Sequence, residues 1–149
     1  ATTLRENQHH VETYSQLLNT YNYDIHDAID TFVEQVEHVD GVKTKDKKAF
    51  LKGFEKGTNE FTQMYEDYFD IEHNFVSTSN ELFDFLLDNQ GRYTYDGGED
   101  TLVFETDAQV NTYNDIIERI QIIGKQEDEW MKKEAELMQK EKRSLQEAS

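Results

Sequence analysis

The chain has 149 residues, 36% of them hydrophobic and 32% charged, and its 32 acidic and 15 basic residues give a formal net charge of −17. This acidity argues against binding to nucleic acid or to anionic lipid surfaces, because their phosphate groups would repel the chain. The sequence has no cysteine, which excludes disulfides, thiolate metal sites and cysteine nucleophiles, and no proline, which suits long uninterrupted helices.

The first 40 residues carry an apolar residue at every seventh position, a pattern that predicts one helix over residues 1–40. The repeat consists of Leu4, Val11, Leu18, Ile25, Phe32 and Val39. Asp40 and Gly41 mark its end, since glycine readily adopts the left-handed conformation that follows a helix.

A second helix is predicted over residues 44–89 from two apolar series with the same period. The first series is Phe54, Phe61, Tyr68, Phe75 and Leu82, and the second is Gly57, Met64, Ile71, Thr78 and Phe85. Thr44 or Asp46 suits the N-cap, and Gly91 follows the helix end. Gly57 falls on the seam, where it would permit a close approach of another helix.

The period then changes to the alternation typical of strands, which predicts a β-hairpin over residues 92–105. Tyr93 and Tyr95 share one face, as do Leu102 and Phe104. Glycines in the intervening Gly97-Gly98-Glu99-Asp100 turn would supply positive φ angles. A last helix is predicted over 107–145, with Thr106 or Asp107 as its N-cap.

Three long amphipathic helices with short connections predict an all-α fold, an elongated antiparallel three-helix bundle with coiled-coil-like heptads. The small hairpin lies between the second and third helices and leans on the bundle through Leu102 and Phe104, because an isolated hairpin is only marginally stable. We expect residues 1–149 to form one domain.

Charge is unevenly distributed along the chain. Residues 43–56 hold six lysines and two acids, whereas residues 57–118 hold one arginine and 15 acids. In an up-down-up bundle this pattern predicts one acidic and one basic end. Such ends are either solvated surfaces, polarised docking surfaces, or complementary surfaces through which two copies associate.

The sequence predicts no metal centre and no cofactor. Glu6 and His9 have the spacing of carboxylate-bridged metal bundles, as does the weaker pair Asp70 and His73, but both pairs fall on outward heptad positions. Glu34 and His38 suit at most a peripheral zinc contact.

We also expect no enzymatic activity. The chain has no Gly-x-Ser-x-Gly, no phosphate-binding loop and no Gly-x-Gly-x-x-Gly after a strand. A thin helical rod also offers little concavity for a substrate.

The candidate partner-binding site is the hairpin. It consists of Tyr93, Tyr95, Asp96, Glu99 and Asp100. Since only one face of the ribbon can cover the bundle, the tyrosines are either an adhesive patch for a protein partner or a lid over the bundle end. The three carboxylates are alternatively a calcium site, although their spacing differs from that of an EF-hand.

From Tyr93 onward, the hairpin, Phe104-Glu-Thr-Asp107 and the helix with Tyr113-Asn-Asp-Ile116 resemble the C-terminal part of small uncharacterised bacterial envelope lipoproteins. The resemblance covers about 35 residues and brings no catalytic residues. It implies an extracytoplasmic helical domain in which Ala1 lies shortly after a lipidated N-terminus. No apolar run is long enough to span a bilayer, so direct membrane insertion by this chain is not expected.

We therefore expect a non-enzymatic extracytoplasmic protein-binding or scaffold domain of the cell envelope, with an N-terminal lipid anchor. The alternative is a cytoplasmic acidic decoy, or antitoxin-like inhibitor, that occupies a basic site on its target. A self-associating coiled coil is a third interpretation.

Overall fold

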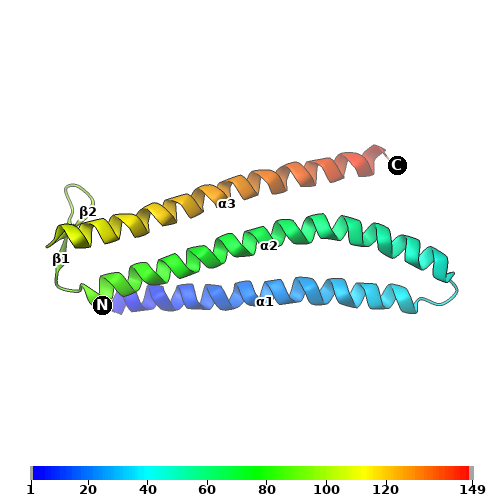
Figure 1. Ribbon diagram of the computed structural model, residues 1–149, viewed down its shortest axis with the longest axis horizontal. Coiled ribbons are helices and arrows are strands. Elements are labelled where there is room, and N and C mark those ends of the chain that lie inside the picture. Colours follow the sequence, from blue (N-terminus) through cyan, green and yellow to red (C-terminus); the bar gives the residue numbers. More distant parts are fainter. Residues whose placement is uncertain (1, 148–149) are drawn as a thin grey trace. The chain divides into compact units, whose positions relative to one another are not determined.

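The computed structural model describes residues 2–147, which form three helices and a two-stranded hairpin (Figure 1). The elements are α1 (Thr2–His38), α2 (Thr44–Asp88), β1 (Tyr93–Asp96), β2 (Thr101–Phe104) and α3 (Asp107–Glu147). This confirms the predicted helical fold, with the hairpin between the second and third helices. None of the helices in the described part of the chain is long and apolar enough to cross a membrane.

The chain divides into two compact units. The central unit is Gln16–Asp70, and the terminal unit combines Ala1–Ser15 with Ile71–Ser149. α1 and α2 contribute residues to both units, whereas the hairpin and α3 lie in the terminal unit. That residues 1–149 fold as one domain stays a prediction.

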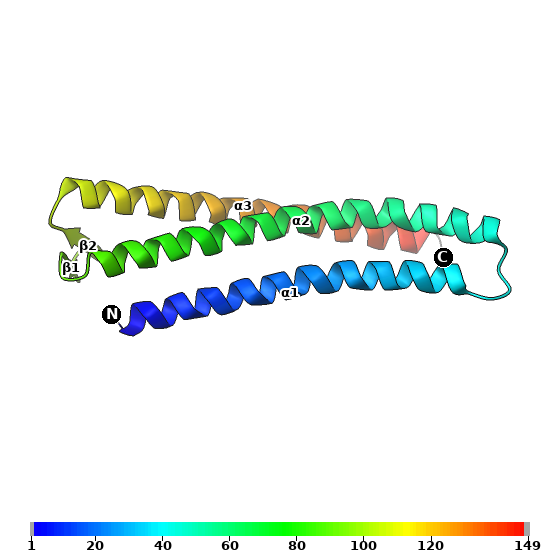
Figure 2. The same ribbon diagram turned by 60° about the horizontal axis from the view of Figure 1, so that its bottom comes forward.

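The central unit is a helical hairpin (Figure 2). Gly41 has a φ of 79°, which only glycine adopts without strain, and it turns the chain between the two helices. The Lys47 ammonium donates to the backbone oxygen of Glu37 at 2.7 Å, satisfying a carbonyl at the end of α1. The ring of Phe32 in α1 contacts the ring of Phe54 in α2, with 4.5 Å between the ring centroids.

Two local predictions for α2 are wrong. The carbonyl of Lys43 accepts hydrogen bonds from the N–H groups of Asp46 and Lys47, so Lys43 occupies the N-cap position rather than Thr44 or Asp46. A Cβ added to Gly57 would meet no atom within 4 Å in the described chain, so this glycine does not admit a closely packed helix.

In the terminal unit, α2 contacts both α1 and α3. The Gln8 amide donates to Asp84 at 2.9 Å, and Arg119 of α3 donates to Glu81 at 2.7 Å. The apolar side chains buried in this unit come from α2 and α3: Val76, Leu86, Ile116, Ile123 and Trp130. Ile116 is the most completely buried of these side chains, at 1% exposed.

This interior also holds a carboxylate. Glu72 is only 5% exposed, and the Tyr14 hydroxyl donates to its Oε2 at 2.6 Å. Burial, followed by the negative charges of Glu72 and Asp128, raises the pKa of the half-buried Glu127 on α3. The ionised Glu127 side chain therefore opposes folding at neutral pH.

Replacing Glu127 with Gln is expected to raise the melting temperature at pH 7, because it removes a charge whose folded-state pKa lies above its unfolded value. The gain should vanish as the pH falls below the ordinary value of 4.5, where the wild-type carboxyl is neutral in both states. Thermal unfolding followed by circular dichroism over this pH range measures both effects. Glu129→Gln, at an exposed position on the same helix, is the matched control and should change little.

Candidate functional site

The register of the hairpin places both tyrosines beside the apolar residues of the opposite strand. The strands are antiparallel, with Tyr93 opposite Phe104 and Tyr95 opposite Leu102. Because directly paired residues project from the same side of a sheet, all four side chains share one face. Thr94 and Val103 pair on the other face.

The shared face is anchored by an aromatic cluster centred on Phe104. The centroid of the Phe104 ring lies 5.5 Å from the ring centroid of Tyr93 in β1, 5.6 Å from that of Phe85 in α2 and 5.2 Å from that of Tyr113 in α3. All three ring pairs are tilted, a geometry that aromatic side chains favour. Phe104 and Leu102 are half-buried, as expected for a hairpin that leans on helices.

Polar contacts hold the start of α3 against the end of α2 beside this cluster. Thr106 is the N-cap of α3: its hydroxyl accepts from the Gln109 N–H at 3.3 Å, and Gln109 Oε1 accepts from the Thr106 N–H at 3.0 Å. The Gln109 amide also donates to Asn89 at 2.8 Å. The sequence left Thr106 and Asp107 open, and the geometry selects Thr106.

The two predicted tyrosines occupy different environments. Tyr93 is half-buried in the aromatic cluster, where its ring contacts Phe104. Tyr95 lies two residues farther along β1, toward the tip of the hairpin, and is 64% exposed. Asp96, Glu99 and Asp100 are exposed around it. The hairpin thus has an anchored base and an exposed tip.

Tyr95 is held by a charged acceptor at the tip. Its hydroxyl donates to Asp100 Oδ1 at 2.6 Å, and this bond, more than burial, raises the pKa of the Tyr95 phenol above its ordinary value of 10.0. The phenol proton is thus directed at the Asp100 carboxylate.

The turn differs from the prediction in its backbone. Neither Gly97 nor Gly98 has a positive φ; instead Asp100, the last residue of the four-residue loop, has a φ of 52°. Aspartate tolerates this conformation better than most residues. Asp96 accepts a hydrogen bond from the Gly98 N–H at 2.8 Å, which closes the loop through a side chain.

The carboxylates at the tip and the predicted histidine pairs do not gather into a metal centre. No group of three or more histidine, aspartate and glutamate residues with metal-binding geometry occurs within residues 2–147. The His38 ring nitrogen contacts the backbone oxygen of Glu34 at 2.7 Å, not its carboxylate. Glu6, His9 and Asp70 are exposed, whereas His73, predicted to face solvent, is half-buried.

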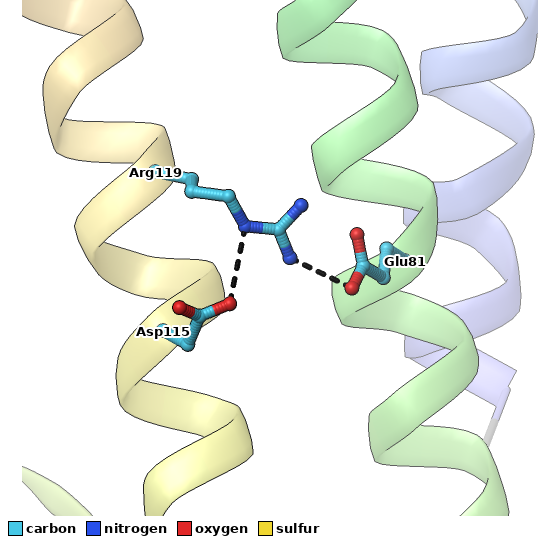
Figure 3. A network of polar contacts seen from close by, with 3 residues as sticks. All are labelled: Glu81, Asp115 and Arg119. Carbon is cyan, nitrogen blue, oxygen red and sulfur yellow. Dashed lines mark hydrogen bonds and ion pairs between the residues drawn. The ribbon is translucent and has the colours of Figure 1, made fainter.

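A second surface feature is a groove between α2 and α3 in the terminal unit. It has a volume of about 310 Å³ and is lined by Asn74, Ser77, Thr78, Arg119, Ile122 and Ile123. The Arg119 guanidinium is already paired at its rim, with Glu81 at 2.7 Å and Asp115 at 3.4 Å (Figure 3). The hydrogen bond from Arg119 lowers the pKa of Glu81. The groove therefore presents the apolar side chains of Ile122 and Ile123 beside an arginine that is already ion-paired.

Comparison with known proteins identifies no relative. No family model, no curated protein and no solved structure matches this chain.

Phe104→Ala is expected to destabilise the terminal unit by about 2 kcal/mol, because it removes a half-buried ring that contacts three elements. Val103→Ala is the matched control on the same strand. Val103 is 50% exposed on the other face, so its truncation should cost less than about 0.5 kcal/mol. Denaturant unfolding checks both values, and equal losses would contradict the anchoring role of Phe104.

Asp100→Asn is expected to lower the pKa of Tyr95, since it removes the anionic acceptor that stabilises the neutral phenol. In the wild type, this hydrogen bond contributes stability below pH 10 and loses it as the pH rises through the raised pKa of Tyr95. NMR titration of ring-labelled tyrosine checks the shift, with Tyr95→Phe assigning the resonance. An unchanged Tyr95 pKa in the variant would show that the bond is absent in solution.

Proposed function

We propose that this chain is a non-enzymatic protein-binding domain that uses the hairpin tip, Tyr95 with Asp96, Glu99 and Asp100, to bind a basic surface of a partner protein. The observation that carries the proposal is an exposed tyrosine on an anchored hairpin. Tyrosine supplies a large contact area and loses little conformational freedom on binding, which makes it a frequent interface anchor.

Local order at the tip supports this interpretation. The Tyr95 side chain is oriented by Asp100, and the loop is closed by Asp96. Groups that are held in position before binding lose less entropy when the complex forms. Three carboxylates beside one aromatic ring would complement lysine or arginine side chains, by ion pairing and by contact of a cation with the ring face.

We further propose that the domain acts outside the cytoplasm, with a lipid anchor near its N-terminus. This part of the proposal is supported by the resemblance of the hairpin and the following helix to envelope lipoproteins. A cytoplasmic acidic decoy is the alternative, and it is favoured by the one arginine and 15 acids of residues 57–118. The two differ in partner location and in the effect of salt.

Affinity capture from fractionated lysate of the source cell, with the wild type and two variants, tests the proposal. Tyr95→Ala should reduce partner recovery about tenfold or more, as loss of an aromatic anchor does. Val103→Ala, on the opposite face of the same hairpin, should leave recovery unchanged. Both variants should melt close to the wild type, because both side chains are at least half exposed.

The salt dependence and the cell fraction separate the alternatives. Recovery of an envelope protein that is weakened but not abolished at high salt, with the predicted loss in Tyr95→Ala, supports the extracytoplasmic binding domain, because salt screens the carboxylates but not the apolar contact of the Tyr95 ring. Recovery of a basic cytoplasmic protein that salt releases, regardless of Tyr95, contradicts it and supports the decoy, because screening weakens exposed charge pairs.

A further inference from the structure

A stripe of exposed residues in the central unit has a self-complementary charge order. The stripe follows α2 with alternating spacings of four and three residues, which keeps it on one side of the helix. Its members are Lys45, Ala49, Lys52, Lys56, Asn59, Gln63, Glu66 and Asp70. All eight are exposed.

The sign of the charge reverses at the middle of the stripe. Lys45, Lys52 and Lys56 lie before Gly57, with the exposed Lys48 beside them. Glu66 and Asp70 lie after it, with the exposed Glu60 and Asp67 beside them. The set is four lysines followed by four acids, and a further exposed acid, Glu55, lies among the lysines.

This order matches the geometry of two antiparallel copies. If two identical α2 helices pair about a two-fold axis between residues 57 and 58, Lys45 of each copy faces Asp70 of the other. The same operation pairs Ala49 with Glu66, Lys52 with Gln63 and Lys56 with Asn59. Each interaction then occurs twice, which is the defining property of an isologous interface.

The surface at the centre of the stripe also permits close approach. A Cβ added at Gly53 would meet no atom within 4 Å. A hollow of about 520 Å³ lies over Gly53, lined by Ala49, Lys52, Glu55, Lys56 and Asn59. Glycine and alanine would let a second helix lie closer to the backbone than larger side chains allow.

Among residues 2–147, Asp67 is the one member of these four lysines and four acids whose side chain has a hydrogen-bond or ion-pair partner. Its carboxylate accepts a hydrogen bond from the Gln63 side-chain amide at 3.2 Å, and none of the eight forms an ion pair within the described residues. We propose that this stripe is a self-association surface, through which two copies of the chain pair antiparallel along the Lys45–Asp70 segment of α2. The proposal concerns the central unit and is independent of the hairpin tip.

Charge complementarity predicts the strength and salt response of this pairing. The stated register makes one kind of ion pair, Lys45 with Asp70, which occurs twice, and each exposed ion pair contributes little, so association should be weak. The screening length is about 10 Å at 0.1 M salt, longer still at 0.02 M, and only about 3 Å at 1 M, so 1 M salt should dissociate the pair. Sedimentation equilibrium of the full chain at 0.02 M and 1 M salt measures this. A monomer at every concentration in low salt would overturn the proposal.

Reciprocal charge reversal tests the surface itself. Lys45→Glu/Lys52→Glu/Lys56→Glu and Glu60→Lys/Glu66→Lys/Asp70→Lys should each weaken self-association about tenfold or more, because like charges then face one another. An equimolar mixture of the two variants should associate, since an acidic stripe meets a basic one. Failure of the mixture to associate, with both variants helical by circular dichroism, would contradict the assignment.

A matched control distinguishes the effect of the α2 stripe on self-association from the effect of the net charge of the chain. Lys132→Glu/Lys133→Glu/Lys140→Glu changes the same number of charges at exposed positions of α3 and should associate like the wild type, apart from a small general repulsion. An equal loss in this control would show that association follows net charge and not the α2 stripe.

Single cysteines test the antiparallel geometry, as the native chain has none. Asn59→Cys lies near the proposed axis and should form a disulfide between copies under mild oxidation. Lys45→Cys should not, because two Lys45 positions would be separated by 25 residues along the helices, roughly 38 Å. Efficient disulfide formation at both positions would instead indicate parallel pairing and overturn this arrangement.

Discussion

The candidate site depends on the contacts that the Phe104 ring makes with three neighbouring aromatic rings. The Phe104 ring touches Tyr93, Phe85 and Tyr113, and so joins the hairpin to α2 and α3 within the terminal unit. A two-stranded ribbon of four residues per strand has too little buried surface to be stable alone. With the ring in place, the base of the hairpin is fixed and its tip stands exposed with Tyr95.

Much of this architecture follows from spacing in the sequence. Apolar residues at every seventh position define α1 and α2, because only a helix places them on one side. Gly41 and Gly91, both with positive φ, mark where the two helices end. The change to alternating residues after Gly91 locates the hairpin. These signals are local, and local signals determine elements better than they determine contacts.

The site was less completely predictable. A four-residue loop at Gly97–Asp100 pairs Tyr95 with Leu102 and so places residues of both strands on one face. The alternation within each strand does not by itself give this register. The positive φ of Asp100 follows from the loop geometry, whereas composition favoured the glycines. Buried Glu72 had no sequence signal, because its partner Tyr14 is 58 residues away and charged side chains usually face solvent.

The account rests on a hairpin that is held in place before any partner binds, and amide hydrogen exchange measures this directly. Glu105 N–H bonds to the Arg92 carbonyl, so the alternation of an antiparallel ladder makes Thr94 and Val103 the next hydrogen-bonded pair. A docked hairpin predicts that these two amides exchange slowly, with protection close to that of the last turns of α2. Exchange at the rate of an unstructured peptide would show that the hairpin is not anchored, and would contradict the proposed binding surface.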